Sequence, residues 1–362
     1  MSLSTSTAAP SAVSTQNQPL YPFRLAPIYK EYFWGGSRIK DRFHRQSAPN
    51  GRVAESWEVV DHENGVSLIS NGPLAGLSLH EITSTRPEGI FGVESHLFDR
   101  FGRFPLMFKY INAEEMLSVQ VHPKEVRARE LDYSDTGKAE AWLVVDVAPD
   151  SVMYIGFNRH YSPSDVRTAI EEGRIESLLH RIKPKVGDCY MLEPGTIHSM
   201  GKGVLLAEVQ QTSDMTFRLF DWNRKDENGN ERPLHIEQGL QAIDYKIGAV
   251  FPQKPHPTEY QNCERLVICD EFTLNRWSFE EVMVWATDNR CHIWSVLQGN
   301  VTAIFHLGRR GTPENLSGRQ TDPIAMECLK PGDTLLVPNT CRSIQWTSDS
   351  DEHVVLIDMC GT

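Results

Sequence analysis

The chain lacks the long apolar segments that would place it in a membrane or on an export pathway. Its 362 residues contain no run approaching the roughly 18 apolar residues that a membrane-spanning helix needs. Residues 1–18 carry neither basic side chains nor an apolar segment, so they do not have the pattern of a secretory signal peptide. We therefore expect no membrane association.

Paired cysteines and an excess of positive charge are also absent. The seven cysteines are an odd number without a Cys-x-x-Cys pair, which argues against a disulfide framework or a thiolate zinc site and favours a reducing cytoplasm. Lys and Arg number 36 against 48 Asp and Glu, giving a formal net charge of −12. This balance disfavours nucleic acid as a partner, although a local basic cluster can still hold a small anion.

Composition along the chain predicts its domain organisation. A chain of this length is expected to form two or three structural units. Residues 1–18 are rich in Ser, Thr, Ala and Pro and are predicted to be a disordered tail. A Pro-rich linker separates a domain over 19–251 from a second over 258–362. Short strands punctuated by turns dominate both, with a helical insertion at about 162–182.

The clearest chemical signal is a set of four possible metal ligands. Gln120 and His122 lie two residues apart in an apolar run typical of a strand, so their side chains point to the same face. Glu140 opens the next predicted strand, and His198 follows a Pro-Gly turn. Each histidine alone is more often structural. Together, two imidazoles, a carboxylate and an amide suit a divalent metal.

One turn-strand-turn unit occurs twice, which indicates two related β units. Residues 185–198 resemble residues 330–342, each with a Gly-Asp turn, an apolar strand and a proline. The strand beginning at Glu140 likewise matches the strand beginning at His292, and the second copy has no Gln-x-His segment. We therefore predict a mainly β fold of two barrels, the second of which lacks the metal ligands.

Two levels of family resemblance accompany these motifs. The Gly-Asp turn, apolar strand and Pro-x-x-x-His pattern resembles cupins, which are jelly-roll β-barrels. The longer segments Leu117-Ser-Val-Gln-Val-His-Pro, Gly137-Lys-Ala-Glu-Ala-Trp and Glu208 to Arg224 resemble the short bacterial form of type I mannose-6-phosphate isomerases. The resemblance runs from about Pro27 to the C-terminus. It implies one catalytic zinc per chain, bound by Gln120, His122, Glu140 and His198.

This resemblance also implies a reaction and roles for basic residues. Interconverting an aldose and a ketose moves a proton between C1 and C2 through an enediol, which needs a Lewis acid and a proton carrier. Lys138 would share a face with Glu140 and could carry the proton. Arg218 would stabilise the enediolate. Lys109 would serve either acid-base transfer or the substrate phosphate, unless it only reaches the strand edge. The competing interpretation of Lys138 is a rim lysine, and that of Arg218 is an ion pair with Asp221 or Glu208.

Three further residues are candidates for substrate binding. Ser118 would share the face of Gln120 and contact the phosphate or sugar. Trp34 would form a pocket wall, or alternatively part of the core. Glu208 alternates with apolar residues, which favours a buried partner that orients another site residue.

The sequence leaves other functions open. A non-catalytic cupin that binds a metal and a sugar is the main alternative, followed by an isomerase of an unphosphorylated sugar. A metal-dependent oxygenase is disfavoured because Gln120 suits redox iron poorly. The expected partner is a small-molecule sugar phosphate, and the expected assembly is a monomer or a small homo-oligomer.

Overall fold

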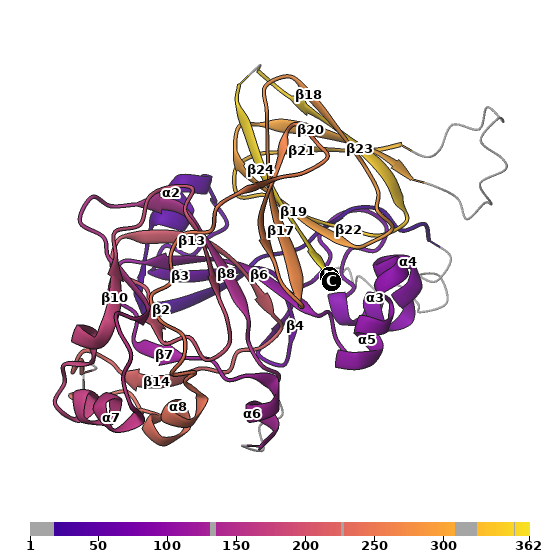
Figure 1. The fold of residues 1–362 in the computed structure, drawn as a ribbon. Coiled ribbons are helices and arrows are strands. Elements are labelled where there is room, and N and C mark those ends of the chain that lie inside the picture. Colours follow the sequence, from indigo (N-terminus) through magenta and orange to yellow (C-terminus); the bar gives the residue numbers. More distant parts are fainter. Residues whose placement is uncertain (1–17, 131–134, 226–227, 308–323, 351) are drawn as a thin grey trace, which may run out of the picture.

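The computed structural model describes residues 18–130, 135–225, 228–307, 324–350 and 352–362. Within these ranges the chain is mainly β, which confirms the predicted fold class, and its strands form two pairs of sheets (Figure 1). The tail predicted over residues 1–18 lies, except for Gln18, outside the described part of the chain.

The N-terminal sheet pair holds the predicted metal ligands. Its larger sheet has six strands in the order β11 (Cys189–Leu192), β8 (Glu140–Val147), β13 (Val204–Gln211), β6 (Leu106–Ala113), β3 (Val53–Val59) and β2 (Ile28–Gly36). Its smaller sheet has five strands in the order β10 (Leu179–Ile182), β9 (Met153–Phe157), β12 (His198–Ser199), β7 (Val119–Val121) and β14 (Phe217–Phe220).

The C-terminal sheet pair repeats this arrangement with different strands. Its seven-stranded sheet has the order β1 (Phe23–Arg24), β22 (Thr334–Val337), β19 (His292–Gln298), β24 (Val354–Gly361), β17 (Phe272–Phe279), β16 (Cys263–Ile268) and β15 (His256–Pro257). Its four-stranded sheet has the order β18 (Val282–Ala286), β23 (Cys341–Ser348), β20 (Val301–Leu307) and β21 (Ile324–Leu329). A separate hairpin joins β4 (Asp61–His62) and β5 (Gly65–Val66).

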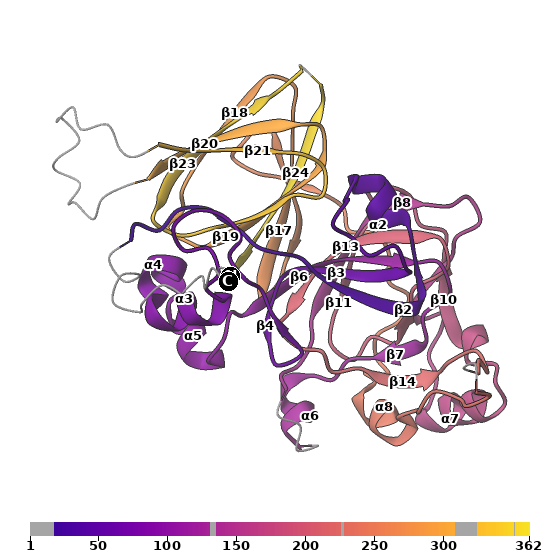
Figure 2. The same cartoon turned by 180° about the vertical axis from the view of Figure 1, so that it is seen from behind.

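Helices gather at two places around the sheets (Figures 1 and 2). One group lies beside the C-terminal sheet pair: α3 (Leu79–Thr85), α4 (Pro87–Phe91), η1 (Gly92–Glu94) and α5 (His96–Phe101). The other covers the five-stranded sheet: α7 (Pro163–Glu171), η2 (Ile175–Leu178) and α8 (Ile236–Ala242). Two further short helices in the described residues are α2 (Arg38–Phe43) and α6 (Glu125–Glu130).

The central strands β6 and β13 of the six-stranded sheet are buried on both faces. In β6, Tyr110 points toward the C-terminal sheets and its neighbour Ile111 toward the five-stranded sheet, because successive side chains alternate. In β13, Leu205 and Leu206 divide in the same way. The Tyr110 hydroxyl also lies 2.7 Å from that of Ser295 on β19. The two large sheets therefore share one apolar layer.

The helical insertion is shorter than predicted. Helix α7 begins with a capping box in which the Ser162 hydroxyl accepts from the backbone N–H of Asp165, as its Ser-Pro start suggests. The continuation of helix to residue 182 is wrong, because β10 follows η2 and pairs with β9. Leu179 packs under α7 whereas Ile182 faces the core between the sheets. Periodicity alone does not distinguish such a short apolar run from a helix.

Two short strands place sequence-distant segments in the C-terminal sheet pair. Phe23 and Arg24 of β1 pair with Leu336 and Leu335 of β22, although they precede the whole N-terminal sheet pair. At the other end, β15 lies inside the Pro-rich linker and pairs with β16. The domain boundaries at 251 and 258 remain a prediction.

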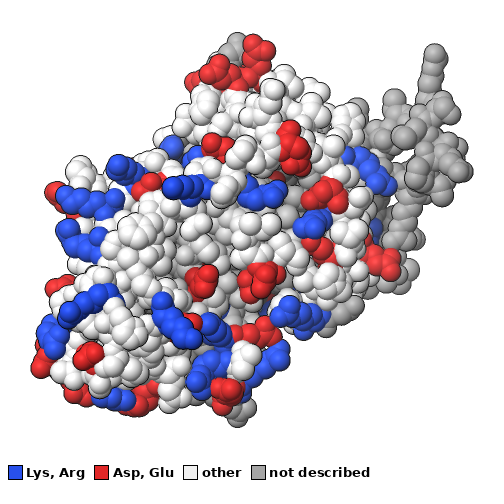
Figure 3. Space-filling model, in the orientation of Figure 1, with Lys and Arg blue, Asp and Glu red and all other residues white. Residues whose placement is uncertain are grey.

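The surface charges are mixed in spite of the net charge. Figure 3 shows basic and acidic side chains interspersed on one face, with uncharged areas between them. In the described part of the chain, none of the helices is both long and apolar enough to cross a membrane.

A buried ion pair connects the two sheet pairs. Arg45, which follows α2, donates to both carboxylate oxygens of Glu58 at 2.7 and 3.0 Å and to the hydroxyl of Ser56 at 2.7 Å. The same guanidinium donates to the carbonyl of Gly332, in the turn before β22. The side chains of Arg45 and Glu58 are 9% and 4% exposed. Solvent therefore cannot compensate either charge if its partner is removed.

We expect Arg45→Ala to lower the free energy of unfolding by about 3–5 kcal/mol, because Glu58 would be left buried without its partner. Chemical denaturation measures this loss. Arg174→Ala is the control, since Arg174 pairs with Glu172 and both side chains are half exposed; it should cost about 0–1 kcal/mol. Equal, small losses in both variants would contradict a stabilising role for the buried pair.

Candidate metal centre and active site

The five-stranded sheet presents three of the predicted site residues on one face. Gln120 on β7 is directly opposite His198 on β12 and Arg218 on β14. Directly opposed residues of antiparallel strands point to the same side of a sheet. Val119 and Val121, which flank Gln120, pack on the other side beneath the helices. The polar face is therefore turned toward the six-stranded sheet.

The six-stranded sheet contributes charged residues from its facing side. Glu208 on β13 is opposite Lys109 on β6 and Trp142 on β8, and Glu140 precedes Trp142 by two residues. Alternation therefore brings Lys109, Glu140 and Glu208 to one face, together with the Trp142 side chain of the apolar core between the two sheets.

A glycine turn sets the position of His198. Gly195 has φ of +96°, and its N–H donates to the carbonyl of His122 at 2.7 Å. A Cβ at this residue would lie 2.9 Å from the backbone nitrogen of Asp244. The Pro-Gly turn thus needs glycine both for its conformation and for close approach, and it connects the segments that carry the two histidines.

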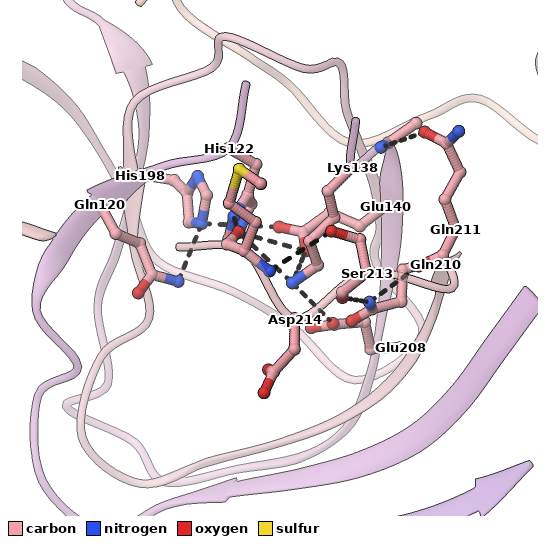
Figure 4. A network of polar contacts seen from close by, with 12 residues as sticks. Gln120, His122, Lys138, Glu140, His198, Glu208, Gln210, Gln211, Ser213 and Asp214 are labelled. Carbon is pink, nitrogen blue, oxygen red and sulfur yellow. Dashed lines mark hydrogen bonds and ion pairs between the residues drawn. The ribbon is translucent and has the colours of Figure 1, made fainter. Parts of the chain in front are cut away.

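Three donor side chains meet between the sheets (Figure 4). The ligand atoms of His122, Glu140 and His198 all lie within 4.8 Å of one another. Nε2 of His122 is 3.6 Å from one Glu140 oxygen, and Nε2 of His198 is 3.5 Å from the other. All three side chains are buried.

Hydrogen bonds orient both imidazoles for metal binding. Nδ1 of His122 lies 2.7 Å from the carbonyl oxygen of Met215, and Nδ1 of His198 lies 2.9 Å from that of Thr196. A carbonyl only accepts, so each Nδ1 carries the proton and each Nε2 presents its lone pair to Glu140. Burial lowers the pKa of both histidines, which favours the neutral ligand form.

Glu140 is the group that most requires a cation. Both of its oxygens are buried and accept no hydrogen bond from the described residues. Nζ of Lys138 lies 3.0 Å from one oxygen, as an ion pair without hydrogen-bond geometry. Burial raises the pKa of Glu140, but the charge of Lys138 outweighs burial and lowers the pKa overall. A buried carboxylate with free lone pairs fits a metal ligand.

The amide of Gln120 is placed to complete the set. Its Nε2 lies 3.2 Å from Nε2 of His198. The nitrogen and oxygen of a side-chain amide occupy nearly the same positions, so a half-turn brings the oxygen to this point. The structure thus brings together all four residues predicted from the sequence, and their donor chemistry fits a divalent metal.

A chain of alternating charges continues from this centre. Nζ of Lys138 lies 3.6 Å from Glu208, Glu208 lies 3.4 Å from Nζ of Lys109, and that Nζ lies 3.3 Å from Glu55. Burial lowers the pKa of Lys109, but Glu208 and Glu55 outweigh burial and raise it. Glu55 is not among the site residues predicted from the sequence, although a charge within an apolar strand is a detectable signal.

Arginines gather beside Asp221, just beyond β14. Arg224 and Arg232 lie 2.5 and 3.5 Å from the same Asp221 oxygen. Burial and the charge of Arg232 lower the pKa of Arg218, whose Nε is buried and donates no hydrogen bond to a described residue. Positive charge therefore exceeds negative charge here, as an anion site requires. Arg232 lies in a polar loop, where no sequence pattern singled it out.

The remaining two candidates are buried. Ser118 directly precedes β7 and is 3% exposed. Trp34, at 5% exposed, packs with Trp142 in the apolar core between the two sheets. Their contact with substrate remains a prediction.

The fold and these donors define a class: a mainly β protein with a buried His-Glu-His centre suited to a divalent metal. Comparison with known proteins then gives the family. Residues 22–142 match the family model "Phosphomannose isomerase type I, catalytic domain". The probable mannose-6-phosphate isomerase GmuF of Bacillus subtilis is 35% identical, covering 77% of this chain and 87% of that protein. The mannose-6-phosphate isomerase of Streptococcus mutans is 32% identical, covering 92% and 97%.

Solved structures agree with these relatives. The crystal structure of the Bacillus subtilis mannose 6-phosphate isomerase superposes with a TM-score of 0.78 at 27% identity, covering 94% of this chain and 99% of that one. A putative mannosephosphate isomerase from Archaeoglobus fulgidus, 20% identical, shares the fold with a TM-score of 0.72 over 96% and 99%. The chain belongs to the mannose-6-phosphate isomerase family and is an aldose-ketose isomerase. The resemblance inferred from the motifs is confirmed.

Proposed function

We propose that the enzyme interconverts mannose 6-phosphate and fructose 6-phosphate by proton transfer between C1 and C2 through an enediol. We further propose that one zinc ion is held by Gln120, His122, Glu140 and His198. Glu140 carries this proposal, because its two buried oxygens accept no hydrogen bond from the described residues and face two imidazole lone pairs. The mannose-6-phosphate isomerase relatives support the choice of substrate.

The donor set favours zinc among common divalent metals. Imidazole nitrogen with one carboxylate is the donor chemistry of catalytic zinc sites, which keep a coordination position open. When bound, zinc would act as a Lewis acid that polarises a substrate oxygen. The two carbonyls of Met215 and Thr196 fix the histidine tautomers that such a site requires.

Lys138 is the residue proposed to move the proton. Its Nζ lies 3.0 Å from Glu140 and 3.4 Å from Nε2 of His122, so it borders the metal position. Glu208 links it to Lys109, so each of these three buried side chains has a neighbour of opposite charge. Glu208 is thus the residue that positions Lys138. Lys109 contributes to proton transfer indirectly, through its contact with Glu208.

Arg218 is proposed to stabilise the negative charge of the enediolate. It lies across from Gln120 on the neighbouring strand and points to the same side. Its guanidinium donates to the carbonyl of Pro233 at 3.0 Å, while Nε is left without a partner among the described residues. A fixed donor that is already desolvated costs little reorganisation when charge develops.

The substrate phosphate is proposed to bind at the arginine cluster. Arg224 and Arg232 lie over the ring of Phe33, at 4.9 and 5.6 Å from its centroid, and share the single carboxylate of Asp221. Arg232 is the more weakly held of the two and is partly exposed, so it can turn toward an anion. An isomerase of an unphosphorylated sugar would have no need of this excess charge.

We also infer that the enzyme works in the cytoplasm as a monomer or small homo-oligomer. All seven cysteines are free thiols, which supports a reducing compartment.

Turnover of mannose 6-phosphate to fructose 6-phosphate, followed in a coupled assay, tests the proposal. We expect chelation to abolish turnover and zinc to restore it, and His122→Ala to be inactive because it removes a ligand. His256→Ala, in an exposed strand far along the chain, should retain full activity. A folded, zinc-loaded enzyme without turnover of this substrate would refute the proposed reaction.

Comparing two arginine variants separates phosphate binding from chemistry. We expect Arg232→Ala to raise KM for mannose 6-phosphate about 10- to 100-fold, as loss of a charged hydrogen bond predicts, without changing the turnover of free mannose. We expect Arg218→Ala to lower kcat about 100- to 1,000-fold. Arg167→Ala, which removes an exposed pair with Glu237, is the matched control. Equal losses with both sugars in Arg232→Ala would contradict a phosphate contact.

A further inference from the structure

The C-terminal sheet pair repeats the turn that precedes β11. In both copies a backbone N–H donates to the aspartate of a Gly-Asp turn: Lys185 to Asp188 at 2.9 Å, and Lys330 to Asp333 at 3.1 Å. The residue four positions after the aspartate is Leu192 in the first copy and Val337 in the second. Leu192 is directly opposite Glu140 on the neighbouring strand, and Val337 is directly opposite His292. His292 therefore occupies the place of Glu140, as the sequence alignment predicted.

The equivalence extends to the neighbouring strands. Trp142 and Trp294 each follow the equivalent residue by two positions, and they oppose Glu208 and Asp358 respectively. A buried carboxylate thus recurs beside the central position in both sheet pairs. The C-terminal copy has kept polar side chains where an inert β core would have apolar ones.

Three metal-binding side chain types converge on His292. The ligand atoms of Asp288, His292 and Cys360 lie within 4.8 Å of one another. His292 and Cys360 are buried, whereas Asp288 is exposed at the edge of the cluster. Thiolate, imidazole and carboxylate together form a donor set typical of zinc.

A second carboxylate orients His292. Asp358 lies 3.4 Å from Nδ1 of the imidazole, and Asn275 holds Asp358 by donating to its other oxygen at 2.7 Å. Nε2 is left facing Asp288 at 3.0 Å. Metal-binding histidines are commonly held by a carboxylate on the opposite ring nitrogen in this way.

Negative charge exceeds positive charge around His292. The carboxylates of Asp288 and Asp358 lie 3.0 and 3.4 Å from its two ring nitrogens, and Nε of Arg290 lies 3.8 Å from Asp288. A divalent metal bound by Nε2 and by the Cys360 thiolate would release the protons that these atoms carry.

The cluster opens into a cavity whose lining includes an unpaired polar atom. Asp288, His292, Asp358 and Cys360 line this cavity of about 550 Å³ together with Trp277. Nε1 of Trp277 is buried and makes no hydrogen bond within the described chain. The Trp277 residue is more than nine-tenths buried. Native cores rarely leave such groups unpaired unless water or a ligand completes them.

We propose that Asp288, His292 and Cys360 form a second, previously unassigned site for a thiophilic divalent metal such as zinc, open to the cavity of the C-terminal sheet pair. Three protein donors leave at least one coordination position for water or a small oxygen ligand. This site is independent of the first, because no donor is shared between them and the first contains no sulfur.

Cobalt(II) is the probe that distinguishes the two sites, because only a thiolate ligand gives a sulfur-to-cobalt charge-transfer band. We expect the metal-free chain to bind two equivalents of Co²⁺, one of which produces this band. Cys360→Ser should abolish the band and one equivalent, whereas Cys328→Ser, which changes an exposed cysteine on β21, should preserve both. His122→Ala should lose the other equivalent and keep the band.

A variant at the exposed ligand Asp288 provides a second test, because a change at the buried Cys360 can also disturb folding. Asp288→Asn changes a carboxylate at the cavity edge and should weaken the cobalt binding that produces the band by at least about tenfold, while circular dichroism stays unchanged. Absence of the charge-transfer band in the unmodified chain would overturn the proposal. Persistence of the full band in Cys360→Ser would also overturn it, since another cysteine would then be the ligand.

Discussion

The structure of the site depends on one buried carboxylate. Glu140 has both oxygens out of contact with solvent and without hydrogen bonds from the described residues, a state that costs several kcal/mol unless positive charge compensates it. The surrounding residues supply that compensation in layers. Lys138 forms an ion pair, the histidines turn their lone pairs inward, and Glu208 balances the lysines in turn. A divalent metal at this point would satisfy the acceptors that the protein leaves open.

The sheet that carries Glu140 explains why the chain has a second sheet pair. Strands β6, β8 and β13 turn site residues to one side and apolar residues such as Leu143 and Leu205 to the other. That apolar side would be exposed without the seven-stranded sheet, which covers it. Tyr110 with Ser295 and Arg45 with Gly332 add polar contacts across the same junction. The second sheet pair thus supports the active-site sheet, and its own polar cluster at His292 suggests that support is not its sole role.

The features of the site that depend on short-range sequence patterns can be predicted from the sequence. The meeting of Gln120, His122, Glu140 and His198 follows from strand alternation and one Pro-Gly turn, and the match of Glu140 with His292 is confirmed by strand register. Other features depend on tertiary context. The sequence pattern over β10 predicts a helix because four residues carry too little periodicity to identify a strand. The pairing of β1 with β22 rests on only two residues. Arg232 was missed because only the fold brings that loop to Asp221.

The central claim is that a metal ion occupies the space between Glu140 and the two imidazoles. Anomalous diffraction at the zinc absorption edge, from crystals of the zinc-loaded enzyme, tests it most directly. We predict an anomalous peak about 2.0–2.1 Å from Nε2 of both His122 and His198. Crystals of active, zinc-containing enzyme with no peak at that position would contradict it.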